Sequence, residues 1–468
     1  MKRMRLPMLG LLAAALGGCT LAPRYEQPDA PVPDSWPGGE AYSTTQPVDA
    51  PEPAALPWDQ VIVDSRLRSL IELALDNNRD LRTAALNVER VRALYDIQRS
   101  ALLPLVDATG SGSRQRMPAD LSPSGERTTA KQYSVTADLA WEIDFFGRLR
   151  SLESSALEAW FATQEARNSA QILLISSVAE AWFALAADRS NLQLSRTTFE
   201  SQQAALELVQ RRHEQGLTPA LDVHRAQAQV QAARAAVAQF TQRVAQDENA
   251  LRLLVGGAVP GELLPADLGD LAPLRDVSPG VPSEVLLSRP DVVAAEHNLR
   301  AAYANLGAAR AAFFPRIALT ASAGTASSEL SGLFESGSGT WAFAPRITMP
   351  IFDPRTWAAK RVSEVDQQIA LAQYERTIQS AFREVADALA VRGTIDEQIA
   401  AQEALVQAVA DTYRRSNLRY EQGVDSSLSV LDAQRSLYAA EQELVVLRGL
   451  RFANQMRLYA ALGGGWTR

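Results

Sequence analysis

Two long stretches of the chain carry the spacing of apolar residues that α-helices use to pack against one another. Residues 148–215 contain neither proline nor glycine, and small residues alternate there with Leu, Ile and Val at intervals of three and four. Residues 355–422 repeat this pattern, with Gly393 as their only glycine. A single helix of this size would be about 100 Å long, far longer than an ordinary globular helix. Turns at Gly216 and Gly423 then predict that each helix folds back as a hairpin.

Two other regions alternate apolar and polar residues with a period of two, which predicts strand hairpins at residues 105–146 and 316–352. Between Tyr133 and Asp144 the odd positions are apolar and the even positions are mostly polar. Strands with one face for lipid and one for water are typical of transmembrane β-barrels. Four strands cannot close a barrel, which needs roughly eight, and open strand edges are not tolerated in lipid. We therefore expect the chain to oligomerise.

The chain is also duplicated. The segment that begins at Ala101 returns at Ala312, an offset of 211 residues, and the segment that begins at Arg212 returns at Arg419, an offset of 207. Each half is expected to hold a first helix (64–102 or 283–314), a strand hairpin and a long helical hairpin. The predicted order is a signal peptide at 1–18, a proline-rich tether at 19–62, a first repeat at 63–255 with its long hairpin at 148–255, a Pro/Gly-rich connection at 256–282, and a second repeat at 283–468 with its long hairpin at 355–462.

The N-terminus has the layout of a secretory signal. Basic residues precede an apolar run at 6–16 that is too short to span a bilayer, and two glycines stand before Cys19. The alternatives are a plain signal peptide with an incidental cysteine and a bacterial lipobox. We favour the lipobox because Cys19 is the only cysteine and stands where a lipobox needs it. Cys19 would then carry a diacylglyceryl group and an N-acyl chain such as palmitate, and Thr20 in place of an aspartate favours the outer membrane.

Composition narrows the function further. No other run of about 18 apolar residues occurs, so no transmembrane helix is expected in the mature chain. The net charge of −8 offers no basic surface that would attract nucleic acid. The chain contains no nucleophile elbow, no P-loop and no H-E-x-x-H zinc motif, so nothing in the sequence points to an enzyme.

Several short motifs occur in a fixed order behind the lipobox. They are Glu142-Ile-Asp-Phe-Phe-Gly-Arg148, Ala311-Ala-Phe-Phe-Pro-Arg-Ile317, Pro350-Ile-Phe-Asp353, Tyr420-Glu-Gln-Gly423, Leu431-Asp-Ala-Gln-Arg435 and Ala461-Leu-Gly-Gly-Gly-Trp466. Each motif alone is weak, but their order, spacing and duplication are specific. Together they resemble the outer-membrane factor family, the TolC-like channels, and in particular its lipoprotein branch of multidrug-efflux ducts. The resemblance covers essentially the whole chain.

The resemblance implies a mixed α and β membrane protein that works as a homotrimer. Three chains would form a 12-stranded outer-membrane β-barrel continuous with a periplasmic α-helical barrel. The implied function is the passive exit duct of a tripartite efflux system in a Gram-negative bacterium. Its implied partners are outer-membrane lipid, a periplasmic adaptor (membrane fusion) protein and an inner-membrane resistance-nodulation-division transporter. The alternatives are the duct of a type I protein-secretion system and a lipid-anchored helical scaffold that forms no channel.

The resemblance also places a gate at the turns of the helical hairpins. It implies an apolar ring at Leu428, an acidic ring at Asp432 and a linking partner at Arg435. Asp222, in the first repeat, is similar to an aspartate at the family's hairpin tips, and Asp425 lies at the second turn itself.

Physical chemistry supports a gate of this kind. Three copies of Asp432 around an axis would attract cations and repel one another, and an arginine or a bound cation could hold them together. The alternative is that Asp432 and Arg435 form an ordinary helix-surface pair worth a few tenths of a kcal/mol. Given the resemblance, we favour the gate. Ser429 stands where some relatives have a second aspartate, so the resemblance supports one acidic ring.

Other polar and aromatic residues have two interpretations each. Residues that could line the pore, or simply be solvated near the rim of the barrel, are Asp138, Glu142, Asp144 and Arg346. Residues that fit an aromatic belt at the membrane interface, rather than the core of the oligomer, are Trp141, Trp341 and Phe343.

His213 and His224 flank the first turn of the helical hairpins. A solvated helix end is favoured over a pH sensor or a metal pair, because eleven residues separate the two histidines and no cysteine is near.

Overall fold

The structure of the chain is a computed structural model that describes residues 20–42, 56–123, 125–280 and 282–465. The signal peptide, Cys19 and Trp466 lie outside the described residues. The chain divides into two compact units. The first, here the sheet unit, comprises Met1–Asp29, Asn87–Thr163 and Ala294–Tyr374; the second, here the hairpin unit, comprises Ala30–Leu86, Gln164–Val293 and Glu375–Arg468.

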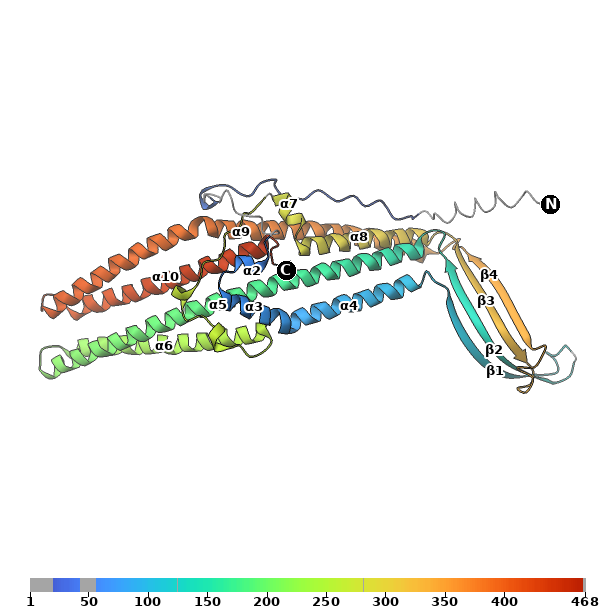
Figure 1. Cartoon of the computed structure of the whole chain (residues 1–468), viewed down its shortest axis with the longest axis horizontal. Helices are drawn as coiled ribbons and strands as arrows, with labels where there is room; N and C mark the ends of the chain where they lie inside the picture. Colours follow the sequence, from blue (N-terminus) through green and yellow to red (C-terminus); the bar gives the residue numbers. More distant parts are fainter. Residues whose placement is uncertain (1–19, 43–55, 124, 281, 466–468) are drawn as a thin grey trace. The chain divides into compact units, whose positions relative to one another are not determined.

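The sheet unit contains a four-stranded antiparallel sheet. Figure 1 shows its strands side by side in the order β1-β2-β3-β4. Their bounds are Leu105–Met117 for β1, Thr128–Ile143 for β2, Arg316–Ser327 for β3 and Gly339–Thr348 for β4. The strand hairpins predicted from the period-2 pattern are confirmed, and together with the long helices they agree with the mixed α and β fold class that the resemblance implied. Within the described chain, β1 and β4 are the open edges of the sheet.

The strand register separates apolar from polar side chains over most of the sheet. Directly opposite residues share a face, and one such row joins Val106, Leu139, Ala321 and Phe343. The apolar face, defined by this row and its neighbours, contains Val106, Ala108, Val135, Ala137, Leu139, Trp141, Ile143, Ile317, Leu319, Ala321, Ala323, Trp341, Phe343 and Ile347. The polar face contains Asp107, Thr109, Ser111, Ser113, Gln115, Thr128, Gln132, Ser134, Thr136, Asp138, Glu142, Arg316, Thr320, Ser322, Thr340, Arg346 and Thr348, with alanines and Gly324 among them and with Leu105 and Met117 at the two ends of β1.

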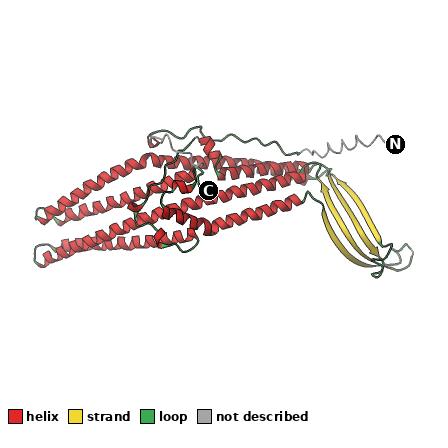
Figure 2. Cartoon of the chain, in the orientation of Figure 1, coloured by secondary structure: helices red, strands yellow, loops and turns green. Residues whose placement is uncertain are grey.

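Four long helices form two hairpins, coloured red in Figure 2. Helix α5 runs over Arg148–Glu214 and α6 over Ala220–Val255, while α9 runs over Pro354–Glu421 and α10 over Ser427–Ala461. The predicted ends of all four helices are therefore correct to within one or a few residues. The connection between the repeats contains two short 3-10 helices, Gly261–Leu263 and Leu268–Asp270.

The helix expected at 64–102 is wrong as a single helix. It is two helices, α3 over Ser65–Asn77 and α4 over Arg79–Ser100, because Asn78 has an extended backbone between them. The Asn78 side chain accepts a hydrogen bond from the backbone N–H of Leu81 at 2.8 Å and donates one to the Leu254 carbonyl at 2.7 Å. Asn78 therefore caps α4 while it holds the end of α6.

Two further expectations in the second repeat need correction. The helix expected at 283–314 is also two helices, α7 over Pro282–Leu287 and α8 over Pro290–Ala311. Proline disfavours a helical residue before it but suits the first position of a helix, so Pro290 starts α8 rather than continuing α7. The second strand hairpin was expected to extend to residue 352, but its last strand ends at Thr348, which pairs with Arg316, the first residue of β3. Among the described residues, no strand offers a partner beyond this pair.

Part of α5 is long and apolar enough to cross a membrane by length and composition alone, yet 61% of that part is buried. Ile175, Val178 and Trp182 lie in the core of the hairpin unit with 0% of their surface exposed. The Trp182 indole N–H donates to the Leu263 carbonyl at 2.9 Å. Packing in the core thus accounts for the apolar composition of this segment.

The proline-rich N-terminal segment is extended, as expected, but it packs on the protein. Within the hairpin unit, the Trp36 ring stacks on Phe382 at 5.2 Å, and its indole N–H donates to the Gly280 carbonyl at 3.0 Å. Gly393 faces the Ala41 carbonyl so closely that any side chain there would collide with it. The short helices Glu40–Tyr42 and Trp58–Val61 interrupt the extended path. The described part of this segment is therefore an extended strap that packs against the hairpin unit and contains two short helices.

Two carboxyl groups meet between α5 and α6 in the hairpin unit. Burial, and then the charge of Asp188, raises the pKa of Asp247 to about 6, and burial also raises the pKa of Asp188. One oxygen of Asp247 is buried with no hydrogen-bond partner among the described residues. The Arg243 guanidinium lies near the pair, with its Nη1 3.9 Å from Asp188 Oδ1.

This pair makes stability depend on pH. A carboxyl whose pKa is raised by folding stabilises the protein below about pH 4 and loses that contribution as pH rises to about 6. We expect Asp247→Asn to raise stability by about 1 kcal/mol near pH 8, because partial hydration screens the pair, and to change little near pH 4.5. Urea unfolding followed by circular dichroism at both pH values measures this. Asp366→Asn, at an exposed position of α9, is the control; an equal gain there would contradict the prediction.

Candidate functional site

The turns of the two helical hairpins have the same backbone. Gly216 and Gly423 both have φ of 74°, a left-handed conformation that glycine adopts without strain. The Leu217 N–H donates to the Arg212 carbonyl, and the Val424 N–H donates to the Arg419 carbonyl, both at 2.9 Å. These bonds close the ends of α5 and α9 in the manner of a Schellman motif. The sequence repeat therefore preserves the turn itself.

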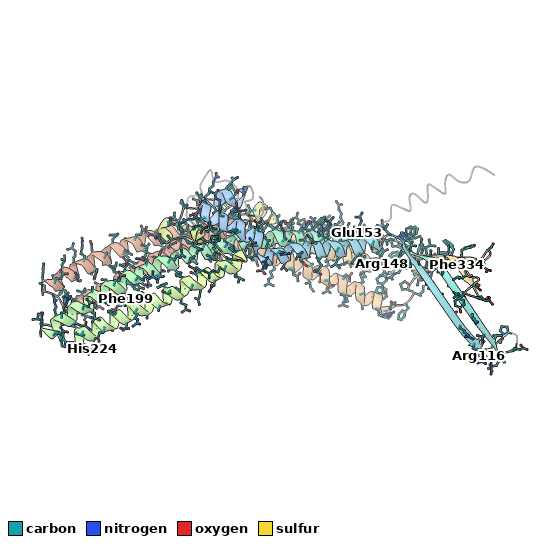
Figure 3. All side chains as sticks on the ribbon, turned by 60° about the horizontal axis from the view of Figure 1, so that its bottom comes forward. Arg116, Arg148, Glu153, Phe199, His224 and Phe334 are labelled. Atoms are coloured by element: carbon teal, nitrogen blue, oxygen red, sulfur yellow. The ribbon has the colours of Figure 1, made fainter. Side chains whose placement is uncertain are left out.

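The side chains of the two turns differ. In the first, the His213 ring donates through Nδ1–H to the Thr218 carbonyl at 2.7 Å. In the second, Arg419 Nε lies 2.6 Å from Asp425 Oδ2, and this guanidinium holds the pKa of the Asp425 carboxyl below its usual range. His224, labelled near the turn in Figure 3, bonds Gln227 at 3.2 Å through Nδ1. Neither histidine bonds the other, so the structure agrees with the solvated-end interpretation.

A contact that the sequence did not reveal joins the two hairpins. The Arg212 guanidinium lies 5.0 Å from the centre of the Tyr420 ring, a cation–π contact between the tips of α5 and α9. The Tyr420 hydroxyl is buried without a hydrogen-bond partner among the described residues. The internal repeat could have revealed this contact, because its offset aligns Arg212 with Arg419 and Thr218 with Asp425. Asp425 holds its arginine within the turn, whereas Thr218 has no charge and leaves Arg212 for the neighbouring hairpin.

Hydrogen bonds continue this connection along α5 and α10. Gln434 donates to Ser201 Oγ at 3.3 Å, and the hydroxyls of Ser195 and Tyr438 lie 2.7 Å apart. Gln434 is buried, with 8% of its surface exposed. The side of α10 that contains Gln434 therefore faces α5.

The opposite side of α10 carries the predicted gate residues. Leu428, Asp432 and Arg435 follow one another at intervals of four and three, so they share one face of the helix, and all three are exposed. Arg435 Nη2 lies 2.6 Å from Asp432 Oδ1. We call this set the gate stripe. The structure thus brings these three residues together and points them away from their own protomer.

The other two gate candidates lie apart from the gate stripe. Asp425 pairs with Arg419 as described, and Asp222 lies on α6, where Arg225 Nη1 is 3.6 Å from its Oδ1. Each of these aspartates therefore has a partner within its own hairpin. Their membership of a gate stays a prediction.

The acidic candidates near the sheet separate into two kinds. Asp138 and Arg346 lie on the polar face, where Asp138 accepts a hydrogen bond from Thr136 at 3.0 Å. Glu142 is held by Arg148, whose Nη2 lies 2.8 Å from its Oε2, at the labelled start of α5 in Figure 3. Asp144 accepts the backbone N–H of Arg150 at 2.9 Å. Glu142 and Asp144 therefore fix the junction of β2 with α5, a role that neither of the two predicted interpretations included.

The aromatic candidates Trp141, Trp341 and Phe343 all lie on the apolar face. The Trp141 indole N–H donates to the Leu102 carbonyl at 3.0 Å, beside the entry of the chain into the sheet. Trp341 and Phe343 are 78% and 60% exposed. Their position on this face is compatible with an interfacial belt, which stays a prediction.

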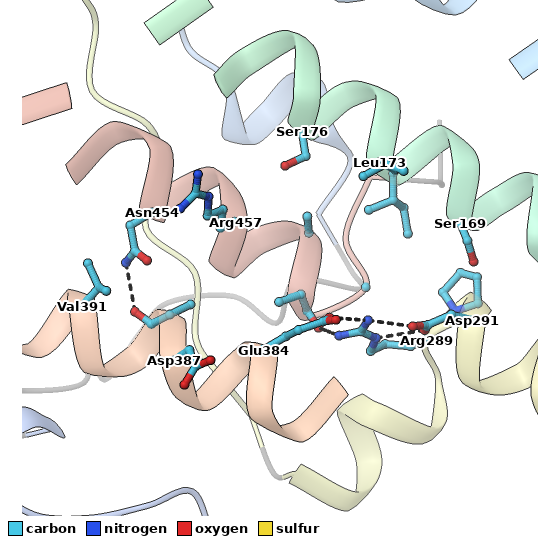
Figure 4. A pocket seen from close by; sticks show the side chains of 16 residues that line it. Ser169, Leu173, Ser176, Arg289, Asp291, Glu384, Asp387, Val391, Asn454 and Arg457 are labelled. Carbon is cyan, nitrogen blue, oxygen red and sulfur yellow. Dashed lines mark hydrogen bonds and ion pairs between the residues drawn. The ribbon is translucent and has the colours of Figure 1, made fainter. Parts of the chain in front are cut away.

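The hairpin unit also contains a cavity of about 550 Å³, shown in Figure 4. Arg289 closes one side of it with only 7% of its surface exposed. Its Nη2 lies 2.7 Å from Asp291 and 2.9 Å from Glu384, and its Nη1 donates to the Ala461 carbonyl. This arrangement ties the start of α8 to α9 and to the end of α10.

The match to a known protein family reproduces the internal repeat of the chain. The model of the family described as outer membrane efflux protein matches residues 70–257 and 281–464. The second match begins 211 residues after the start of the first match and ends 207 residues after its end. These two differences are the same as the two offsets of the internal repeat. The family model therefore recognises both halves of the chain.

Individual relatives match over nearly the full length. The chain is 49% identical over 461 residues to the probable efflux pump outer membrane protein SepC of Pseudomonas putida, covering 97% of this chain and 96% of that one. It is 46% identical to the solvent efflux pump outer membrane protein SrpC of the same species, covering 100% and 99%. A crystal structure of a membrane protein from Pseudomonas aeruginosa matches with a TM-score of 0.88 and 42% identity, covering 95% and 100%. The open state of the Neisseria gonorrhoeae MtrE outer membrane channel matches with a TM-score of 0.84 and 38% identity, covering 96% and 99%.

Proposed function

The chain belongs to the outer membrane efflux protein family, and from this premise we propose the assembly, cargo and gate of the channel that it forms. The protein lies in the outer membrane, extends into the periplasm and is the exit duct of a resistance-nodulation-division type efflux pump. It is a transport protein rather than an enzyme.

The observation that carries the proposal is the register of the sheet. One face is apolar and the other is polar or small, and both outer strands have open edges within the described chain. Unpaired edges are excluded from lipid, so β4 of one protomer pairs with β1 of the next. Three protomers give a 12-stranded barrel whose apolar face meets lipid and whose polar face lines an aqueous pore.

The cargo is proposed to be small toxic compounds. Relatives are named for the efflux of toluene, solvents and antibiotics. The polar face offers mainly Ser, Thr, Gly and Ala, which suits passage without tight binding. A periplasmic adaptor and the inner-membrane transporter supply the energy and engage the hairpin turns, where the gate stripes of three protomers surround the pore axis.

A deletion strain tests the function. We expect it to become sensitive to toluene and to several unrelated antibiotics, and a plasmid copy of the wild-type gene to restore resistance. Purification of the tagged protein should recover an adaptor and a resistance-nodulation-division transporter. Unchanged resistance together with loss of a secreted protein would instead identify a type I secretion duct.

Lipidation of Cys19 is the second part of the proposal, supported by the lipobox sequence alone. Labelling of cells with radioactive palmitate should mark the wild-type protein and not Cys19→Ser. Mass spectrometry of the mature N-terminus should find a diacylglyceryl group and an N-acyl chain on Cys19. A mature chain that begins elsewhere, or an unmodified cysteine, would contradict lipidation.

A further inference from the structure

The apolar face of the sheet ends in a cluster of basic residues. Arg114 is directly opposite Lys131, and this pair follows the Gly112–Tyr133 pair on the same face. Arg116 lies two residues beyond Arg114, again on this face, opposite Thr129. All three basic side chains are exposed. We call Arg114, Arg116 and Lys131 the basic cluster.

The direction of the chain places this cluster at the outer surface. Strand β1 begins after α4 and β2 leads into α5, so the turn between β1 and β2 lies at the other end of the sheet. The helices extend into the periplasm, and this turn therefore points out of the cell. Figure 3 labels Arg116 at this end of the sheet.

The height of the cluster follows from strand geometry. Apolar residues of β2 run from Ile143 to Tyr133, which at ~3.3 Å per residue and a tilt of about 40° is roughly 25 Å along the membrane normal. That is about the height of the apolar band of outer-membrane barrels. The Tyr133 ring packs over Gly112, where an added Cβ would lie 3.2 Å from it. An aromatic ring with a hydroxyl group suits the membrane interface, so the basic cluster lies just outside the hydrocarbon.

The cluster has an excess of positive charge on the lipid side. Like charges directly opposite on neighbouring strands repel each other, and no ion pair joins any of the three to a carboxylate among the described residues. The polar face at the same level carries Ser113, Gln115 and Gln132, which are uncharged. The basic residues therefore do not line the pore. Binding of an anion at the membrane surface would relieve the repulsion between them.

We propose that the basic cluster binds phosphate groups of the glycolipid of the outer leaflet, lipopolysaccharide, with one such site on each protomer. The guanidinium groups of Arg114 and Arg116 can each hold a phosphate with two parallel hydrogen bonds, and Lys131 adds a point charge between them. The inference rests on the outer-membrane location and is independent of gating.

Binding of lipopolysaccharide to the purified full-length trimer tests the proposal. The probes are lipopolysaccharide with its lipid A phosphates intact and the same material after enzymatic dephosphorylation. We expect the triple variant Arg114→Ser/Arg116→Ser/Lys131→Ser to bind the phosphorylated form on the order of 100-fold more weakly, since each basic residue near an anionic lipid surface contributes about fivefold. Dephosphorylation should weaken the wild type to the same extent. The matched control, Arg316→Ser/Arg346→Ser, removes two cations from the polar face and should stay within about twofold of the wild type.

Several outcomes would overturn the assignment. They are unchanged affinity in the triple variant, an equal loss in the control, equal binding of dephosphorylated material, and equal competition by phosphatidylglycerol vesicles or by inorganic phosphate. If the triple variant does not form trimers, the single variants, each expected to lose about fivefold, carry the test. Conductance in planar bilayers should be unchanged in the triple and single variants of the basic cluster, so a failure here is distinguishable from a failure of the channel function.

Discussion

Purified trimers carrying Leu428→Ala and Asp432→Ala are expected to conduct ions on the order of tenfold better than the wild type in planar bilayers, which corresponds to a barrier lower by about 1.4 kcal/mol. The exposed gate stripe of each protomer turns Leu428 and Asp432 away from α5. In the proposed gate, three such stripes around the pore axis combine an apolar constriction, which water leaves easily, with a ring of carboxylates. Alanine at both positions widens the constriction and removes the ring.

The chain offers a matched control for this variant. Asp411 and Arg414 form a second exposed i,i+3 pair at 2.7 Å, on α9, whereas Asp432 and Arg435 are 2.6 Å apart. Asp411→Ala therefore removes an equivalent helix-surface pair and should leave conductance unchanged. Equal conductance of the gate variant and the wild type would remove Leu428 and Asp432 from the gate and leave them as ordinary surface residues.

The cation–π contact allows the opening motion itself to be tested. If the second hairpin must move away from the first, Arg212→Ala should also raise conductance, because it releases Tyr420. Tyr420→Phe keeps the ring and loses only the unbonded hydroxyl, so it should behave like the wild type. If the Arg212→Ala channel stays closed, the cation–π contact is not what holds the two hairpins together. The hydrogen bonds of Ser195 and Ser201 would then hold them.

Arg289→Ala is expected to cost about 3 kcal/mol of stability, because it leaves two carboxylates and a buried carbonyl without their partner. Arg289 is the buried member of this cluster and joins Asp291, Glu384 and the Ala461 carbonyl. The midpoint of urea-induced trimer dissociation measures the loss. Arg289→Lys should recover only part of it, since an ammonium group cannot reproduce the planar fork of hydrogen bonds.

An exposed arginine on the same helix as Glu384 supplies the comparison. Arg383 pairs with Asp387 at 3.8 Å with both side chains more than 70% exposed, and such pairs contribute between about 0 and 1 kcal/mol. Arg383→Ala should therefore be nearly neutral. Similar losses in Arg289→Ala and Arg383→Ala would show that burial of Arg289 is not what makes its cluster important.

Prediction from sequence succeeded where the signal lies in neighbouring residues. The absence of proline and glycine over residues 148–215 fixes a long helix, and alternation over Tyr133–Asp144 fixes a strand with two faces. Prediction from sequence failed where a residue far away in the chain determines the local structure. Asn78 breaks a helix because it bonds Leu254, which lies 176 residues away in sequence. Pro290 is the exception, since the break between α7 and α8 could have been read from the proline itself.

The same distinction between local and distant determinants applies to the candidate site. The repeat located both turns, and helix spacing placed Leu428, Asp432 and Arg435 on one face. Sequence alone could not show that Arg148 already holds Glu142, because that ion pair depends on the path of the chain between β2 and α5. Nor could it show that Arg212 reaches Tyr420 on the other hairpin.

The sequence by itself determined the four long helices, the strands, their duplication and the need for partner protomers, because backbone preference and hydrophobic period act between residues close in the chain. Only the tertiary structure decided which strand positions lie opposite each other. That register places Arg114 beside Lys131 on the apolar face and Asp138 on the polar face. Register depends on how far each hairpin loop offsets its strands, and a shift of one residue would exchange the two faces.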